Sequence, residues 1–171
     1  MRTIYSLKIS MKSILIYNDI GGVMILRLAT EADISVIIKL RNDMLRAYEE
    51  NLPDDLAKSI RNYLEKHIAD KSCICALAEI DGRIVSMAML CCYEDIPDES
   101  NLNGKCAKLC SVYTVTEFRR KGYMEKLLSY LLDKAKDEGI KAITTSADRN
   151  AMSLYERVGF LTASTVMYID L

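Results

Sequence analysis

The sequence TVTEFRRKGYMEKLL, residues Thr114–Leu128, combines three neighbouring cations, one glycine and the beginning of an apolar helical pattern. The apolar run that precedes the cations, 105–115, is typical of a strand. After the glycine, apolar residues recur at the spacing of one face of an α-helix. The cations therefore lie in a predicted turn between a strand and a helix, and the apolar face of that helix comprises Met124, Leu127, Leu128, Leu131, Leu132 and Ala135.

This turn has the chemistry of an anion-binding site. The first turn of a helix leaves backbone N–H groups unpaired and carries a partial positive charge. Gly122 has no Cβ, so an anion can approach the backbone closely. The nucleotide-binding patterns GxxxxGK[ST] and GxGxxG do not occur in the sequence. Two interpretations remain open from the residues alone, a cradle for a pyrophosphate and an ordinary basic surface loop.

The segments around the turn predict an α/β domain. Asp81-Gly82 separates two apolar runs within 73–93, which indicates a hairpin. Gly139 and Gly159 are expected to end two helices. The expected order is β-α-α-β-β-β-α-β-α-β, a mixed, mostly antiparallel sheet with helices on both faces. In chain order, the expected elements are a strand at 24–28, helices at 34–48 and 54–69, the hairpin at 73–93, a strand at 105–115, a helix at 122–138, a strand at 141–147, a helix at 149–158 and a closing strand at 162–171.

The chain resembles the GNAT superfamily of N-acetyltransferases in two motifs. Residues 119–124, RRKGYM, match that family's Arg/Gln-x-x-Gly-x-Gly/Ala turn, although Met124 replaces the usual small residue. Residues 150–160, NAMSLYERVGF, match the family's last helix. The resemblance covers Met24 to the C-terminus and implies acetyl-CoA, or another acyl-CoA, as co-substrate, with no metal. The binding residues that it implies are Val112, Tyr113, Thr114, Arg119, Arg120, Lys121, Gly122, Tyr123, Met124, Asn150 and Ser153.

Transfer of an acetyl group to an amine requires an oxyanion donor, an acid for the thiolate and a base for the amine. The resemblance assigns the first role to backbone N–H groups near Val112 to Thr114 and the second to Tyr155, whose alternative role is core packing. The strand glutamate that serves as base in many family members is absent, because Ser111 and Tyr113 occupy the neighbouring positions. A water chain or one of three acids remains possible as base, namely Glu49, Glu79 or Glu94.

Two acidic clusters bear on the acceptor. If both border the acceptor side, they would concentrate cations, although ordinary solubilising charge explains them equally well. The leading prediction is an N-acetyltransferase that transfers acetyl from acetyl-CoA to the primary amine of a small cationic molecule or protein, by direct attack in a ternary complex. The alternatives are a non-catalytic acyl-CoA sensor of the same fold and a general phosphate or nucleotide binder. The clusters are Glu49, Glu50, Asp54 and Asp55, and Glu94, Asp95, Asp98 and Glu99.

Composition limits the remaining classes. A net charge of −1 over 171 residues disfavours a nucleic-acid binder, and no apolar run is long enough for a membrane span. The six cysteines lack paired zinc-knuckle spacing, and His67 is the single histidine. A reducing, cytoplasmic location is expected, and a homodimer is possible. The domain is expected to span 24–171, with 1–23 as an extension of unclear role that catalysis does not need.

Overall fold

The computed structural model describes residues 8–11, 14–19 and 22–162. These residues form seven strands and four α-helices, together with two short 3-10 helices at Glu31–Asp33 and Thr116–Phe118. In chain order, the strands and helices are β1 (Lys8–Met11), β2 (Ile14–Asp19), β3 (Gly22–Leu28), α1 (Ile34–Leu45), α2 (Leu56–Ala69), β4 (Cys73–Ile80), β5 (Arg83–Glu94), β6 (Lys105–Thr114), α3 (Tyr123–Asp137), β7 (Ala142–Thr144) and α4 (Met152–Arg157).

The strands form one sheet in the order β1-β2-β3-β4-β5-β6-β7. Neighbouring strands from β1 to β6 are antiparallel, whereas β7 pairs with β6 in parallel. The predicted mixed, mostly antiparallel sheet is confirmed. The expected closing strand at 162–171 falls outside the described residues except for Thr162.

The predicted hairpin of β4 and β5 is also confirmed. Asp81 and Gly82 adopt φ values of 47° and 79°, a combination that glycine accepts freely and aspartate tolerates. The Asp81 carboxylate also accepts a hydrogen bond from the Val23 N–H at 3.2 Å, which ties this turn to β3. The sequence signal was local, and the turn formed where that signal lies.

Two strands precede the predicted start of the domain. β1 and β2 pair in the sheet ahead of β3, and Met24 is the third residue of β3. Leu15 and Tyr17 of β2 pack against the main core. The segment 1–23 thus contributes strands to the sheet, and whether catalysis needs it stays a prediction.

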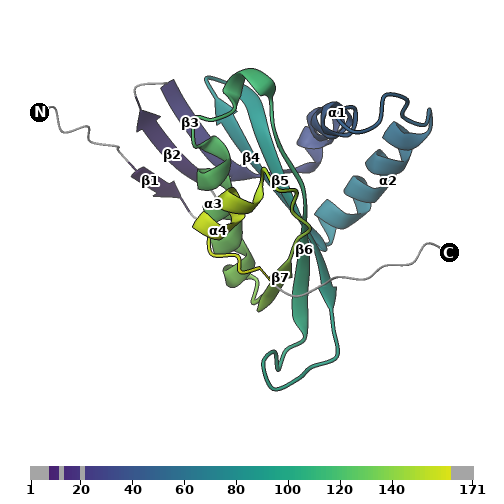
Figure 1. The fold of residues 1–171 in the computed structure, drawn as a ribbon, viewed down its shortest axis with the longest axis vertical. Coiled ribbons are helices and arrows are strands. Elements are labelled where there is room, and N and C mark those ends of the chain that lie inside the picture. Colours follow the sequence, from purple (N-terminus) through teal and green to yellow (C-terminus); the bar gives the residue numbers. More distant parts are fainter. Residues whose placement is uncertain (1–7, 12–13, 20–21, 163–171) are drawn as a thin grey trace, which may run out of the picture.

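Helices cover both faces of the sheet, as predicted (Figure 1). On one face, α3 and α4 pack on a core that includes Leu127, Leu131 and Tyr155. On the other face, α1 and α2 bury Ile37 and Leu64 against β4 and β5. The long loop between β5 and β6 extends away from the helices at the opposite end of the sheet from the 3-10 helix that precedes α3.

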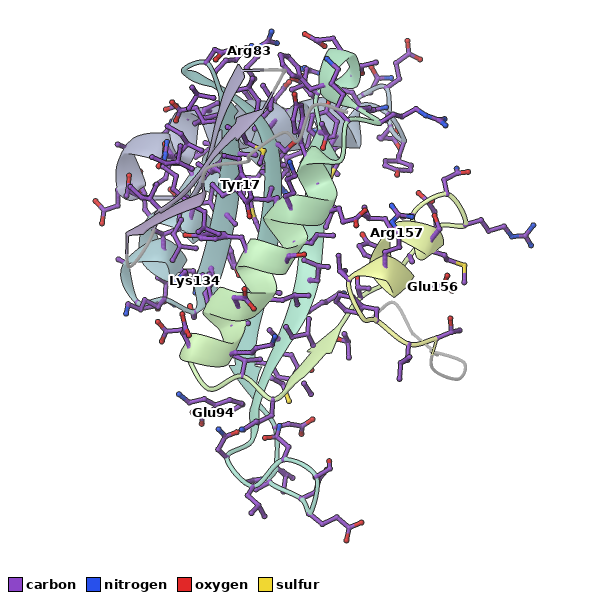
Figure 2. All side chains as sticks on the ribbon, turned by 90° about the vertical axis from the view of Figure 1, so that its left-hand side faces the viewer. Tyr17, Arg83, Glu94, Lys134, Glu156 and Arg157 are labelled. Carbon is purple, nitrogen blue, oxygen red and sulfur yellow. The ribbon has the colours of Figure 1, made fainter. Side chains whose placement is uncertain are left out.

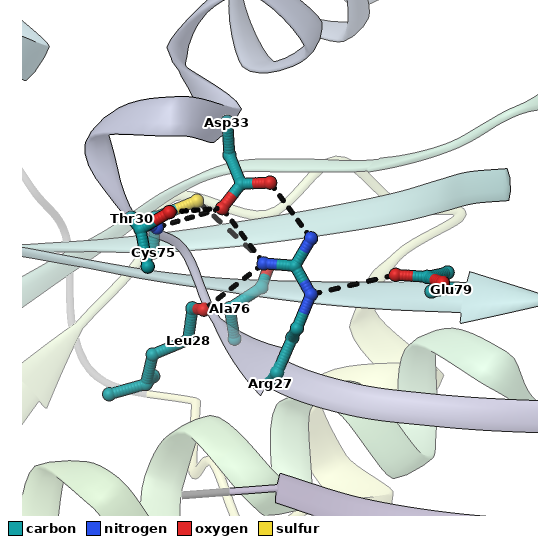
Figure 3. Close-up of polar contacts among 7 residues, drawn as sticks. All are labelled: Arg27, Leu28, Thr30, Asp33, Cys75, Ala76 and Glu79. Carbon is teal, nitrogen blue, oxygen red and sulfur yellow. Dashed lines mark hydrogen bonds and ion pairs between the residues drawn. The ribbon is translucent and has the colours of Figure 1, made fainter. Parts of the chain in front are cut away.

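A closed polar network holds the beginning of α1 (Figure 3). The Arg27 guanidinium donates two hydrogen bonds of 2.8 Å to the Asp33 carboxylate, and the Thr30 N–H donates another at 2.8 Å. Arg27 Nε also lies 3.5 Å from Glu79 Oε2. The hydrogen bond from Arg27, supported by those from Thr30, lowers the pKa of Asp33 to about 2 against the effect of burial.

Candidate functional site

The site begins where β6 and β7 separate. The parallel pairing covers Cys106–Lys108 and Ala142–Thr144, and it ends after Lys108. The Thr145 hydroxyl then donates to the Leu109 carbonyl at 3.3 Å. Beyond this point 109–114 and 145–146 line a groove of about 1130 Å³, which α1, α3 and α4 also border.

A bulge distorts β6 along the groove. Cys110 pairs with Met89 and Tyr113 with Met87, so that two residues of β6 stand opposite one residue of β5. The first of the two, Ser111, has φ of 51° and is buried. Arg41 of α1 donates a hydrogen bond to the Ser111 hydroxyl. Arg41, from the face of the sheet that α1 and α2 cover, thus supports the irregular backbone beside the groove.

The turn before α3 is open at the backbone. Gly122, with φ of 77°, is the residue before the first turn of α3, and no side chain caps that end. Arg120 also has a positive φ, of 60°. A Cβ placed on Gly122 would have no protein atom within 4 Å, so the space above the glycine is open to a ligand. The unpaired N–H groups of the α3 N-terminus therefore face a place that an anion can reach.

The three cations of the turn have different surroundings. Arg119 Nε donates to the Thr114 carbonyl at 2.9 Å, and its guanidinium carbon lies 5.5 Å from the centroid of the Tyr113 ring. Lys121 Nζ lies 5.1 Å from the centroid of the Phe118 ring. No hydrogen bond or ion pair links Arg120 to another of the described residues. Arg120 is thus available to a ligand, while Arg119 connects the turn to the end of β6.

Tyr155 is both a core residue and a groove residue. It is 7% exposed and belongs to the core under α3, with its ring centroid 5.6 Å from that of Phe160. It also lines the groove. Burial raises the pKa of Tyr155 above its usual 10, and a hydrogen bond with the Thr145 side chain opposes that shift. The phenol is therefore protonated near neutral pH and can donate a proton.

The fold brings together the predicted site residues except Lys121, which does not line the groove. Those that line it are Val112, Tyr113, Thr114, Arg119, Arg120, Gly122, Tyr123, Met124, Asn150, Ser153 and Tyr155. The sequence interpretation treated Tyr48 only as part of a helix, whereas α1 ends at Leu45 and Tyr48 lies in the turn after it. The lining residues that it missed include Met44, Ala47, Tyr48, Phe118, Thr145 and Ser146.

The two carboxylates among the lining residues are already engaged. Glu125 forms an ion pair of 2.8 Å with Arg157, which joins α3 to α4. Asp148 accepts hydrogen bonds from the N–H groups of Asn150 and Ala151 at 2.7 and 3.0 Å. Both carboxylates thus have partners, Glu125 through its ion pair and Asp148 through Oδ1 alone.

The three acids considered from the sequence do not line the groove. Glu79 is paired with Arg27 on β3. Glu94 lies beside the β5–β6 loop, at the opposite end of the molecule from Arg83, which pairs with Glu117 close to the turn (Figure 2). The acidic cluster of that loop is therefore remote from the groove. Glu49 follows Tyr48, a groove residue in the turn after α1.

The sequence matches the family model described as the acetyltransferase (GNAT) family over residues 37–160. The chain belongs to this GNAT acetyltransferase family. The match includes the turn before α3, the bulged strand β6 and α4. The two motifs that suggested the family from sequence thus both contribute lining residues to one groove of a GNAT domain.

Solved structures show the same fold at low identity. A predicted acetyltransferase with acetyl-CoA from Clostridium acetobutylicum is 24% identical, with a TM-score of 0.77 over 86% of this chain and 96% of that one. A GCN5-related N-acetyltransferase from Ralstonia eutropha is 21% identical, with a TM-score of 0.72 over 86% and 98% of the two chains. Glucosamine-6-phosphate N-acetyltransferase from Arabidopsis thaliana is 16% identical, with a TM-score of 0.68 over 86% and 97%. A comparison with curated proteins gave no match.

The described residues contain neither a metal-binding cluster nor a membrane-spanning helix. Among the described residues, no three side chains of the types that bind metals lie close enough together to hold an ion. None of the helices in the described ranges is both long and apolar enough to cross a membrane.

Proposed function

We propose that this protein is an N-acetyltransferase that moves an acetyl group from acetyl-CoA to the primary amine of a small cationic molecule or protein, by direct attack in a ternary complex. The observation that carries the proposal is one continuous groove. It joins the open N-terminus of α3, the bulge of β6 and Tyr155. These three parts would supply an anion site for the co-substrate, backbone N–H groups for the oxyanion and a proton donor for the thiolate.

The residues of the turn fit a pyrophosphate. The space above Gly122 is open, the N–H groups of α3 are uncapped, and Arg120 has no partner among the described residues. The acyl arm would then extend between β6 and β7, whose pairing ends at Lys108. Acetyl-CoA, when bound there, supplies the activated acetyl group.

The chain's own groups would act on the two charges that develop. The amine lone pair attacks the thioester carbon, and the backbone N–H groups at Val112 to Thr114 stabilise the resulting oxyanion, a contribution of about 3 kcal/mol. As the carbon–sulfur bond breaks, the Tyr155 phenol gives its proton to the thiolate. We assign the proton that the amine loses to water, since Glu125 is paired with Arg157 and Asp148 holds two backbone N–H groups through Oδ1.

A cationic acceptor is favoured by one acidic cluster. Glu49 and Glu50 directly follow Tyr48, which lines the groove and is 77% exposed. Carboxylates at the mouth of a groove raise the local concentration of cations. Added salt should screen this attraction and raise the acceptor KM. A preference for neutral or anionic acceptors would contradict this part of the proposal.

The test is release of free CoA thiol from acetyl-CoA, measured with a panel of primary amines. A thermal shift by acyl-CoAs should precede it, since a ligand that binds the folded state raises the melting temperature. The proposal requires amine-dependent thiol release and an acetylated amine product. Stabilisation by ATP without stabilisation by acetyl-CoA would instead indicate a general nucleotide site.

A non-catalytic acyl-CoA sensor is the second candidate. The engaged state of Glu125 and Asp148 favours it, because a sensor needs no base. The two candidates separate in the same pair of assays. A sensor would show the thermal shift with acetyl-CoA and no thiol release with any amine.

A further inference from the structure

A cluster of thiols lies on the α1 and α2 face of the sheet, next to the groove. Cys91 of β5 and Cys110 of β6 have their sulfur atoms 3.4 Å apart. The Tyr63 hydroxyl of α2 donates to the Cys91 sulfur at 3.4 Å. The cluster therefore gathers side chains from one helix and two strands, and the proposed acetyl transfer uses none of them.

Its surroundings favour a negative charge on one sulfur. The hydrogen bond with Cys110 is the largest cause that lowers the pKa of Cys91, followed by the bond from Tyr63 and the charges of Arg41 and Lys108, while burial opposes the shift. In turn, the bond to Cys91 and burial raise the pKa of Cys110. The two sulfur atoms can thus share one proton, and the Tyr63 hydroxyl and the two cations favour the negative charge on Cys91.

The positive charge of Arg41 contributes to the lowered pKa of Cys91. Its guanidinium reaches between α1 and the sheet to donate to Ser111, and it has no carboxylate partner among the described residues. A half-buried cation without a counter-ion stabilises a nearby anion. Cysteines elsewhere differ, since burial raises the pKa of Cys73, Cys75 and Cys92. Reactivity should therefore concentrate at one sulfur.

We propose that Cys91 and Cys110 form a reversible oxidation site, at which a hydroperoxide oxidises Cys91 and Cys110 resolves the product to a disulfide. The Cys91 thiolate attacks the peroxide oxygen, which yields a sulfenic acid and releases hydroxide or alkoxide. The Cys110 sulfur then attacks the Cys91 sulfur, and the sulfenic oxygen leaves as water. The two cysteines lose two electrons in total, which the peroxide gains, and a small thiol reverses the bond by exchange.

The location of Cys110 links this site to the groove. Cys110 lines the groove and directly precedes Ser111, the bulge residue with positive φ. A disulfide brings sulfur atoms to about 2.05 Å, so the two strands must adjust beside the bulge. We expect oxidation to weaken acetyl-CoA binding in the groove. This link, unlike the oxidation site itself, rests on the proposed function.

The first experiment maps the oxidised cysteines in the full chain. The reduced protein is treated with hydrogen peroxide, the remaining thiols are alkylated, and peptides are analysed by mass. We expect a Cys91–Cys110 cross-linked peptide, two hydrogen atoms lighter than the reduced pair, which dithiothreitol restores. Oxidation that begins at Cys92 or Cys106, or that proceeds equally at all cysteines, would overturn the proposal.

Three variants test the roles of individual side chains in the oxidation of Cys91. Cys110→Ala removes the resolving thiol and also the Cys110 hydrogen bond, so Cys91 sulfenic acid should form more slowly but persist and react with a dimedone-type probe. Cys92→Ala is the matched control, because it removes the adjacent half-buried thiol of β5 and should leave the disulfide unchanged. Tyr63→Phe removes the hydroxyl donor, so alkylation of Cys91 should slow at neutral pH and its pH midpoint should rise. An unchanged midpoint would contradict the role given to Tyr63.

The second experiment compares acetyl-CoA binding to the reduced and oxidised protein by calorimetry. Weaker binding after oxidation, restored by dithiothreitol, supports the link to the groove. Equal binding would overturn the link and leave the disulfide in place. If even the reduced protein does not bind acetyl-CoA, the proposed function fails, whereas the peptide map still decides the oxidation site.

Discussion

An arginine lies close to the beginning of both α1 and α3, but the two arginines differ in whether other side chains hold them. At α1, Arg27 is held by Asp33 and Glu79, and Thr30 closes the network (Figure 3). At α3, the preceding residue is a glycine without a side-chain cap. Arg120, beside that glycine, pairs with none of the described residues.

The two helix beginnings should therefore contribute to different properties, that of α1 to stability and that of α3 to ligand binding. Removing one partner of a charge pair that is shielded from water leaves an uncompensated group and destabilises the fold. A helix end that is left uncapped loses some stability but keeps its N–H groups for a ligand. Changes at α1 should therefore alter folding and leave acetyl-CoA affinity intact, while changes at α3 should do the reverse.

Gly122→Val should give the largest effect on the binding side. A side chain there would occupy space that is open in the free protein and that the pyrophosphate is expected to fill. We expect acetyl-CoA affinity, measured by calorimetry, to fall about 5- to 150-fold, which corresponds to about 1–3 kcal/mol for an overpacked site. Equal affinity in wild type and variant would place the pyrophosphate elsewhere.

Gly82→Val is the matched control for backbone strain. Gly82 has φ of 79°, close to the 77° of Gly122, and a Cβ there also has no atom within 4 Å. The two variants should therefore lose similar stability, since valine resists positive φ at both positions. Only the variant at Gly122 should lose acetyl-CoA.

Asp33→Asn tests the stability side. The carboxyl has a pKa of about 2 in the folded protein against 3.8 in the unfolded chain, which corresponds to about 2 kcal/mol. Because the folded pKa is the lower one, this contribution is complete above the unfolded value and is lost as the pH falls from about 4 towards 2. The gap in unfolding free energy between wild type and variant, measured with urea, should shrink over that window.

Asp133→Asn controls for loss of a surface carboxylate. Asp133 lies 3.4 Å from Lys136, and its side chain is 70% exposed, so its removal should change stability little. Acetyl-CoA affinity should stay the same in both aspartate variants. If Asp33→Asn weakened acetyl-CoA binding without unfolding the chain, the separation between the two helix starts would not hold.

Tyr155→Phe tests the role of one hydroxyl within the groove. The ring keeps its core contacts, while the proton donor is lost. We expect kcat to fall about 10-fold or more with acetyl-CoA affinity nearly unchanged, because general acid catalysis acts in the transition state. Tyr130→Phe is the control, since Tyr130 is 3% exposed in the same core and does not line the groove. A wild-type rate in Tyr155→Phe would leave Tyr155 a packing residue.

The sequence predicted elements whose signals are local. The Asp81-Gly82 hairpin and the apolar face of α3 depend on residues a few positions apart, and both formed as expected. The turn at 119–124 was found in the same way, since strand, cations, glycine and helix are contiguous. Family resemblance then located the groove through α4, which the sequence alone would have given only a packing role.

Features that depend on contacts between distant residues were not predicted. The bulge at Ser111 needs Arg41, 70 positions away, and the pair of Cys91 and Cys110 needs a diagonal across two strands. Tyr48 reaches the groove because α1 ends beside β6, which no spacing reveals. The sequence placed both acidic clusters near the acceptor, whereas the long β5–β6 hairpin carries one of them to the far end of the sheet.

The N-terminal segment should have the smallest effect on catalysis. β1 and β2 lie at the opposite edge of the sheet from β6 and β7, so the groove contains no residue from them. A chain beginning at Met24 is therefore expected to keep kcat within about twofold of wild type, since no transition-state contact is removed. Its stability should fall, because Leu15 and Tyr17 leave the core and the edge of β3 becomes exposed.

A chain beginning at Gly22 is the control, as it keeps the hydrogen bond between the Val23 N–H and Asp81 and should be the more stable of the two. Loss of acetyl-CoA binding in a folded chain that begins at Met24 would show that the far edge of the sheet also supports the open start of α3.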